Sequence, residues 1–306
     1  MDVQHVAFVG ADGKLGPSVL KALASSGQFN ITVQKRRSSS SVSNYPPSVQ
    51  TVLIPDEFPV DDLIEALKGK DAVVVTVNGS LDKLQMRLAD AAAQAGVKQF
   101  IPADFGSCDS QEQMICELVP IFQRKANVRN HLNSLVVRYP GFLWTSLVCG
   151  HFFDQEDLEF LHIDLKRQKA DVLDDGETRA STSTFHQIGS AVVKILERRG
   201  MEEIKNRVIY IQSFFVSQMQ VVRAFEHAMG QKWEISHINS ATLIKEKKEE
   251  ADKKGTVASV DLVWALGTLY ANWEKKDGFA NEVLGLVEED ISKVVANFVD
   301  LNDNHS

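Results

Sequence analysis

The stretch that most constrains the fold of this chain is an apolar run followed by three regularly spaced glycines. Val6–Val9 is typical of a buried strand, and Gly10, Gly13 and Gly16 follow it before a helical pattern that opens with Pro17. Such glycines allow a sharp turn, a close approach of the backbone to a pyrophosphate, and packing of helix on strand. The start of the helix presents free N–H groups to phosphates. We predict dinucleotide binding, with an ordinary strand–helix turn as the alternative.

Strands and helices alternate along the first half of the chain. Further strands are expected at 29–33, 51–54, 71–77, 99–101 and 143–148, with helices at 60–67 and 81–96. This alternation predicts an α/β fold, a Rossmann-like doubly wound parallel sheet. We expect residues 1–153 to form the dinucleotide-binding domain and 154–306 mainly a smaller capping region for substrate, with a strand near 207–211 returning to the first domain.

The end of the second strand indicates which dinucleotide is bound. An NAD enzyme usually carries an acidic residue there, which binds the ribose 2′-hydroxyl. This chain has Lys35, Arg36 and Arg37 instead, about twenty residues after the glycines. Because arginine can bind a phosphate with two parallel hydrogen bonds, these residues predict NADP(H), and a solvated basic turn is the alternative. Loops at the carboxyl ends of parallel strands bind ligands, so Thr76 and Asn78 are candidate cofactor neighbours.

The charge and cysteine content narrow the partners. A net charge of −8 argues against nucleic acid or an anionic membrane, and no apolar run is long enough to cross a bilayer. The first five residues lack the basic start of a signal peptide. Three cysteines without metal-type spacing predict reduced thiols and no metal site. We expect a cytoplasmic monomer or homodimer that acts on a small molecule.

The second half is less regular. Residues 181–184 are expected to begin a helix that continues from 185 to 199, and Ser217 to begin an amphipathic helix that stops at Gly230. The charge run at 245–254 predicts a solvated helix face with i,i+4 pairs.

One lysine lies on an apolar helix face. After Pro120, the residues Ile121, Val128 and Leu132 fall on one arc of a helix, and Lys125 lies in its middle. Burying an ammonium is costly unless it is paired or deprotonated. Lys125 therefore forms a structural ion pair or reaches the surface, or it points into a cleft with a lowered pKa and exchanges protons.

Several of these segments together resemble the NmrA-like family, in its isoflavone reductase-like branch, which includes phenylcoumaran benzylic ether reductases. The segments that carry the resemblance are the glycine motif, the basic end of the second strand, Phe100–Gly106, Phe122–Arg129, Ser217–Gln218 and Gly230–Trp233. The resemblance implies that Lys125 is the catalytic acid or base and that Arg36 contacts the 2′-phosphate of NADPH. The cofactor residues expected from motif and resemblance together are Gly10, Asp12, Gly13, Lys14, Leu15, Gly16, Lys35, Arg36, Arg37, Thr76, Asn78, Asp104, Phe105, Lys125 and Gly150.

The chain departs from the family pattern at two of these positions. Asp12 stands where many members have threonine or serine, and its charge opposes phosphate binding unless Lys14 offsets it. Asp104 replaces the glutamate of the family motif. His151 follows the sixth strand and is a candidate second proton donor, with a structural histidine as the alternative; His186 is a weaker candidate for the cleft.

We therefore predict an NADPH-dependent reductase of a small, aromatic or polycyclic secondary-metabolite-type substrate. Two alternatives stay open at this point: an enzyme of the same fold without net redox chemistry, such as a cyclisation or condensation, and a dinucleotide-sensing regulatory protein. A poised Lys125 argues against the sensor, which has no need of one.

Overall fold

A computed structural model describes residues 3–41, 44–154, 158–256 and 259–303. The expectation for the first five residues falls partly on residues 1–2, which lie outside the described residues. Among the described residues, no helix combines the length and apolarity needed to cross a membrane.

The central element is a seven-stranded sheet in the order β11-β6-β5-β4-β1-β2-β3. Every neighbouring pair in it is parallel. Its strands are β1 (His5–Val9), β2 (Asn30–Arg36), β3 (Gln50–Ile54), β4 (Ala72–Val75), β5 (Gln99–Ile101), β6 (Leu143–Val148) and β11 (Arg207–Tyr210). The central strands are buried along nearly their whole length, which explains their unbroken apolar sequences. The predicted Rossmann-like doubly wound sheet is confirmed.

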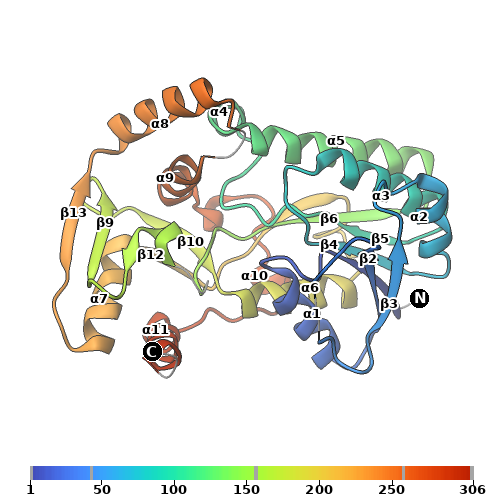
Figure 1. Cartoon of the computed structure of the whole chain (residues 1–306), viewed down its shortest axis with the longest axis horizontal. Coiled ribbons are helices and arrows are strands. Elements are labelled where there is room, and N and C mark those ends of the chain that lie inside the picture. The colour runs from blue at the N-terminus through green and yellow to red at the C-terminus, as the bar shows by residue number, and fades with distance from the viewer. Residues whose placement is uncertain (1–2, 42–43, 155–157, 257–258, 304–306) are drawn as a thin grey trace.

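Helices cover both faces of this sheet (Figure 1). One face carries α2 (Val60–Leu67), α3 (Asp82–Gln94) and α5 (Pro120–Arg138), whose apolar residues share one core with the sheet. The other carries α1 (Gly16–Ser25) and α6 (Phe185–Glu197), which pack on each other. The short helix α4 (Gln113–Leu118) precedes α5.

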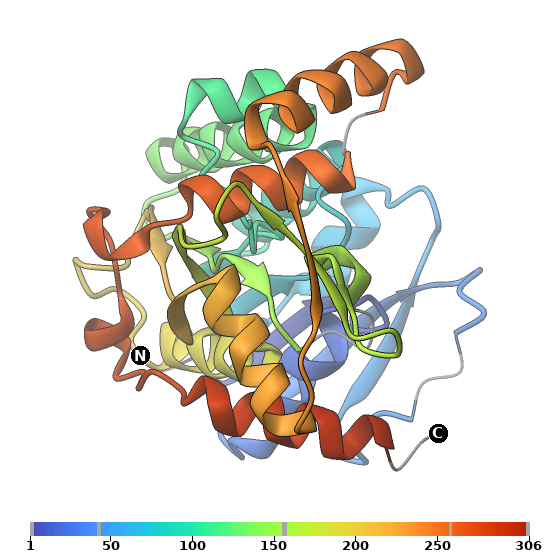
Figure 2. The same ribbon diagram turned by 90° about the vertical axis from the view of Figure 1, so that its left-hand side faces the viewer.

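Most of the rest of the chain forms a region beside the carboxyl ends of the strands, which is called the capping region below because of this position. Figure 2 shows it facing the viewer, with α9 across its upper part and α11 along its base. It contains two small sheets, β12-β10-β7 and β13-β9-β8. Its strands are β7 (His151–Phe152), β8 (Ile163–Asp164), β9 (Lys169–Leu173), β10 (Arg179–Ser183), β12 (Phe214–Ser217) and β13 (Glu234–Ile238). Its helices are η1 (Leu158–Leu161), α7 (Gln218–Met229), α8 (Ser240–Lys254), α9 (Val260–Tyr270) and α11 (Ile291–Asp303). The short η2 (Trp273–Lys275) and α10 (Asn281–Leu284) instead pack into the cores on the two faces of the central sheet.

The local sequence explains most boundaries. Ser217 caps α7 in a reciprocal capping box with Gln220, and Gly230 ends the helix with a φ of 67°. The charge run on α8 forms the expected i,i+4 pairs, including Lys248 with Asp252. The predicted helix from residue 185 is confirmed as α6, with Thr184 as its N-cap, but residues 181–183 belong to strand β10 and not to the helix start. Strand β10 pairs with β12 and β7, and these tertiary partners outweigh the local preference of serine and threonine for a helix start.

Candidate active site

A cleft of about 330 Å³ lies at the carboxyl edge of the central sheet, where the capping region meets it. Its walls come from the glycine turn, the loops after β4 and β5, the first turn of α5, the segment after β6, η1 and α9. The residues that line it are Lys14, Asn78, Phe105, Ser107, Ile121, Phe122, Lys125, Gly150, His151, Phe152, Phe160, Val260 and Val263. The cleft thus brings together predicted residues from five separate segments. Ligands of doubly wound folds bind at this edge of the sheet.

Lys125 reaches into this cleft from α5 with a side chain that is only 10% exposed. Its Nζ donates a hydrogen bond to the main-chain oxygen of Asp104 at 2.5 Å and lies 3.9 Å from Asp104 Oδ1. The ammonium therefore has an ion-pair partner and faces the cleft at the same time. Of the two interpretations left open by the sequence, the structure contains the ion pair of the one and the cleft position of the other, and proton exchange by Lys125 stays a prediction.

The turn that carries Asp104 is held in an unusual conformation. Asp104 N donates to Pro102 O at 2.8 Å, and Phe105 has a φ of 38°, in the left-handed region. A bulky residue rarely adopts this region, and such strain is concentrated at functional sites. The turn directs the Asp104 carbonyl toward α5.

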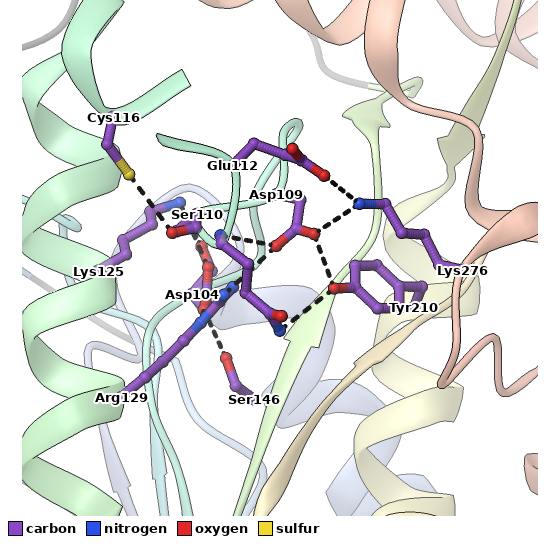
Figure 3. A network of polar contacts seen from close by, with 11 residues as sticks. Asp104, Asp109, Ser110, Glu112, Cys116, Lys125, Arg129, Ser146, Tyr210 and Lys276 are labelled. Carbon is purple, nitrogen blue, oxygen red and sulfur yellow. Dashed lines mark hydrogen bonds and ion pairs between the residues drawn. The ribbon is translucent and has the colours of Figure 1, made fainter. Parts of the chain in front are cut away.

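The carboxylate of Asp104 is fixed from the other side (Figure 3). Arg129 Nε donates to its Oδ2 at 2.6 Å, and Ser146 Oγ donates to the same oxygen at 2.5 Å. Burial alone would raise the pKa of Asp104, but the positive charges of Arg129 and Lys125 overcome it and lower the pKa. Asp104 is therefore a buried anion whose Oδ2 is held by two protein donors, while its Oδ1 faces the Lys125 ammonium without a hydrogen bond.

Burial also shifts the proton affinity of Lys125. Loss of solvation lowers the pKa of its ammonium, and the opposing charge of Asp104 only partly restores it. The same burial raises the pKa of the nearby Cys108 thiol to about 12. The ammonium of Lys125 therefore loses its proton more readily than a solvated lysine does, while the Cys108 thiol stays protonated.

Sequence reasoning missed the acidic residue that continues this network. Asp109 lies 3.5 Å from Arg129 Nη1, accepts from Tyr210 OH at 2.9 Å, and lies 3.0 Å from Lys276 Nζ. These contacts join α5, β11 and the segment after η2 (Figure 3). No local pattern marks them, because their partners lie between 20 and 167 residues away in the chain.

His151 is buried between the cleft and α9. A carbonyl can only accept, so His151 Nε2 carries the proton that it donates to Trp264 O at 3.1 Å. Burial lowers the pKa of His151 to about 4, so the ring is neutral near pH 7. Gly267 of α9 makes room for this ring, since a Cβ there would lie 2.3 Å from His151 Cε1. The single N–H of the neutral ring is therefore already engaged in the hydrogen bond to Trp264 O.

The glycines of the turn serve different purposes. Gly10 has a φ of 94°, and a Cβ on it would lie 2.8 Å from the main chain of Thr76. A Cβ on Gly16 would lie 2.2 Å from Gly10 O. Gly13 has neither a positive φ nor such a clash, since its nearest neighbour would be Gly10 O at 3.3 Å. Of the three glycines, Gly13 is therefore the one at which the fold itself best tolerates a side chain.

The basic residues at the end of β2 differ in their surroundings. Lys35 Nζ lies 3.3 Å from Asp12 Oδ2, and Asp12 also accepts from Ser41 Oγ at 2.5 Å and from Tyr45 OH at 2.6 Å. Lys35, rather than Lys14, thus offsets the charge of Asp12. Arg36 and Arg37 are exposed. Hydrogen bonds from Ser38 lower the pKa of the nearby Asp56 carboxyl most, and the positive charges of Arg36 and Arg37 lower it further.

The remaining predicted residues lie in different places. Thr76 and Leu15 are buried, and Thr76 Oγ1 donates to Gly10 O at 2.9 Å, so it supports the glycine turn. Gly150 lines the cleft and allows β10 to approach closely, since a Cβ on it would lie 1.9 Å from Ser181 O. His186 does not line this cleft; it borders a neighbouring groove along α1 and α6, which Asp12, Gly13 and Lys14 of the glycine turn also line.

Comparisons with known proteins agree with this geometry. The model of the NmrA-like family matches residues 2–253. An oxidoreductase of Aspergillus flavus, aprR, is 30% identical over 305 residues, which cover 96% of this chain and 98% of that protein. A structure of pinoresinol-lariciresinol and phenylcoumaran benzylic ether reductases aligns with a TM-score of 0.77 at 18% identity, over 97% of this chain and 99% of that one. A leucoanthocyanidin reductase–NADPH complex from Vitis vinifera aligns with a TM-score of 0.74 at 15% identity, over 96% and 99% of the two chains.

Proposed function

Because this chain is an oxidoreductase that belongs to the NmrA-like family, we propose that it is an NADPH-dependent reductase of a small aromatic or polycyclic molecule, in which Lys125 transfers the proton. The observation that carries the proposal is the position of the Lys125 ammonium. It lies in an apolar cleft that also contains Lys14 of the glycine turn, Asn78 after β4 and Gly150 after β6.

The glycine turn and the end of β2 fit the cofactor. The chain turns at Gly10 and leaves Gly13 without a side chain at the start of α1, whose first turn has no side-chain cap. Arg36 and Arg37 are exposed at the end of β2, where a 2′-phosphate would bind. NADPH, when bound, supplies the hydride for the reduction. The structure described for the leucoanthocyanidin reductase contains this dinucleotide.

The lining of the cleft supports an aromatic substrate. Four phenylalanines, Phe105, Phe122, Phe152 and Phe160, contribute to its walls together with aliphatic side chains from α5 and α9. Flat apolar rings pack well against such walls, whereas a charged substrate would lose solvation without a partner. The aligned reductases are named for pinoresinol, lariciresinol, phenylcoumaran benzylic ethers and leucoanthocyanidin, and we take these names as support for this substrate class.

Lys125 is the group that manages the proton. The Asp104 carbonyl orients its Nζ, and the apolar surroundings lower the pKa of the ammonium so that proton transfer is easier than for a solvated lysine. His151 does not serve as the acid in this scheme, because its ring is neutral and its Nε2 proton is donated to Trp264 O.

The test is a panel of aromatic and polycyclic substrates incubated with the protein and NADPH, with product and NADPH absorbance followed together. We expect product and NADPH oxidation in equal amounts, and turnover reduced about 10²–10⁴-fold in Lys125→Met at saturating cofactor and substrate. The fold and the NADPH affinity of the variant should stay close to those of the parent. Product without NADPH oxidation would contradict the reductase, and parent-like turnover of Lys125→Met would remove Lys125 from the mechanism.

A further inference from the structure

A glycine in the loop between β4 and α3 lies directly against the stem of Lys125. A Cβ built on Gly79 would be 2.9 Å from Lys125 Cε and 3.5 Å from Ile121 Cδ1. Real Cβ atoms essentially never come this close to a carbon, so the lysine would have to move. Gly79 has no positive φ, and the backbone therefore does not itself require glycine here.

The helix that carries Lys125 is held to the same loop. Arg124 Nη1 donates to Ser80 O at 2.9 Å and lies 4.0 Å from Asp82 Oδ1. Phe122, on the same turn of α5, is buried. Because this turn is attached to the residues that directly follow Gly79, α5 cannot simply retreat from a larger residue.

A second glycine lies near the end of the lysine. A Cβ on Gly106 would lie 3.6 Å from Lys125 Nζ, which is an ordinary contact, and also 2.7 Å from Cys108 O. The lysine thus passes two glycines, Gly79 beside Cε and Gly106 beside Nζ, before it reaches the carbonyl of Asp104. Gly79 is the better position to test, since a side chain on Gly106 would also collide with main chain.

We propose that Gly79 is a positioning residue for Lys125: the missing side chain creates the passage through which the lysine reaches Asp104 O. A methyl group at this position pushes the ammonium out of the passage toward the mouth of the cleft. Misplacement of a catalytic group by about 1 Å can cost about 100-fold in rate. The consequence for turnover rests on the proposed function, whereas the displacement of the lysine does not.

The displacement is measured without any substrate. In protein labelled with ¹³C at lysine Cε, the Lys125 signal is assigned by its absence in Lys125→Met and titrated with pH. In Gly79→Ala we expect this signal to titrate at a higher pH, nearer to an ordinary lysine, because the ammonium regains water. Ser80→Ala changes the neighbouring residue but adds no atom beside Lys125, and it should leave the Lys125 titration unchanged. An unchanged Lys125 titration in folded Gly79→Ala would overturn the proposal.

A double-mutant cycle then tests the route of the effect, with the compound that the substrate panel identifies. Gly79→Ala should lower turnover about 10–100-fold in the parent and less than about twofold in the Lys125→Met background, where no lysine remains to be moved. Equal losses in both backgrounds would mean that Gly79 acts on the fold or the cofactor instead, and would overturn the proposal. Parent-like turnover in Lys125→Met alone would overturn the proposed function and leave the titration result standing.

Discussion

At the scale of single residues, the candidate site depends on main-chain groups as much as on side chains. The acceptor for Lys125 is a carbonyl, the ring of His151 donates to a carbonyl, and the glycine turn is held by Thr76 through Gly10 O. Few side chains in this cleft are therefore available for chemistry. Single substitutions should separate effects on cofactor binding from effects on the stability of the fold.

The first prediction separates two glycines of the turn. Gly13→Ala should fold normally but bind NADPH about tenfold more weakly or worse. Its methyl group meets only Gly10 O at 3.3 Å and Thr76 O at 3.4 Å within the protein, whereas the glycine motif requires close approach of this backbone to the pyrophosphate. Gly16→Ala should instead destabilise the fold, since its Cβ would lie 2.2 Å from Gly10 O. Calorimetric titration with NADPH and thermal unfolding distinguish the two. An unchanged NADPH affinity in Gly13→Ala would contradict the assignment.

A second prediction concerns the choice between NADPH and NADH. Arg36→Ala should weaken NADPH binding about tenfold or more and leave NADH binding nearly unchanged, because a charge-assisted contact to phosphate contributes about 1.5–3 kcal/mol. Arg36 is exposed at the end of β2, whereas Lys35 is engaged with Asp12. The dissociation constants of both dinucleotides give the answer. Equal affinities in the parent protein would remove the basis for this role.

At the scale of elements, patterns within the sequence predicted the central sheet and failed for the small sheets. The residue ranges expected for β5, β6 and α2 agree with the structure, because short apolar stretches in the strands, the amphipathic pattern of the helix and nearby glycines define them locally. Strands such as β7 and β8 have two residues each, and their pairing depends on partners far along the chain. The passage around Lys125 could not be predicted for the same reason: Gly79, Asp104 and Lys125 meet only once the sheet has formed.

A third prediction concerns the junction of β1 and β4. Asp71 accepts from Gln4 N at 3.1 Å and His5 N at 3.0 Å, and it pairs with Lys98 Nζ at 2.9 Å. Burial would raise the pKa of Asp71, but these donors lower it to about 2. Its contribution to stability is therefore present above the ordinary aspartate pKa of about 3.9 and is lost as the pH falls through about 2.

Asp71→Asn should accordingly reduce the free energy of unfolding by about 1 kcal/mol or more at neutral pH, with a difference that shrinks in strong acid. Urea unfolding across this pH range measures it, and Glu203→Gln, on an exposed turn, serves as the control. A constant difference at every pH would show that the loss comes from packing and not from charge.

At the scale of the whole molecule, the network around Asp109 connects the sheet to the end of the capping region. Lys276 Nζ lies 3.0 Å from Asp109 Oδ2 and 2.5 Å from Glu112 Oε1. Burial would lower the pKa of Lys276, but these two carboxylates raise it above its ordinary value. A raised pKa in the folded state contributes stability below the unfolded lysine pKa of about 10.4, and this contribution is lost as the pH rises through the folded value.

Lys276→Met should therefore lower the free energy of unfolding by about 1–2 kcal/mol at neutral pH, because Asp109 stays buried with one partner fewer. The difference from the parent should persist to about pH 10 and diminish above it. Lys275→Met, at the exposed neighbouring position, is the matched control. Urea unfolding of the three proteins as a function of pH tests this, and equal behaviour of the two variants would contradict it.

The order of the strands in the central sheet has a consequence for how the protein is made on the ribosome. Strands β1 to β6 have all been synthesised by Val148, but α6, which covers one face with Ile188, Val192 and Ile195, is complete only at Glu197, and the edge strand β11 only at Tyr210. Until those residues emerge, β6 has an open edge and the face beside α1 lacks its second helix. A nascent chain stalled before residue 197 therefore exposes apolar surface that the finished protein buries, and it needs a chaperone or uninterrupted translation to avoid aggregation.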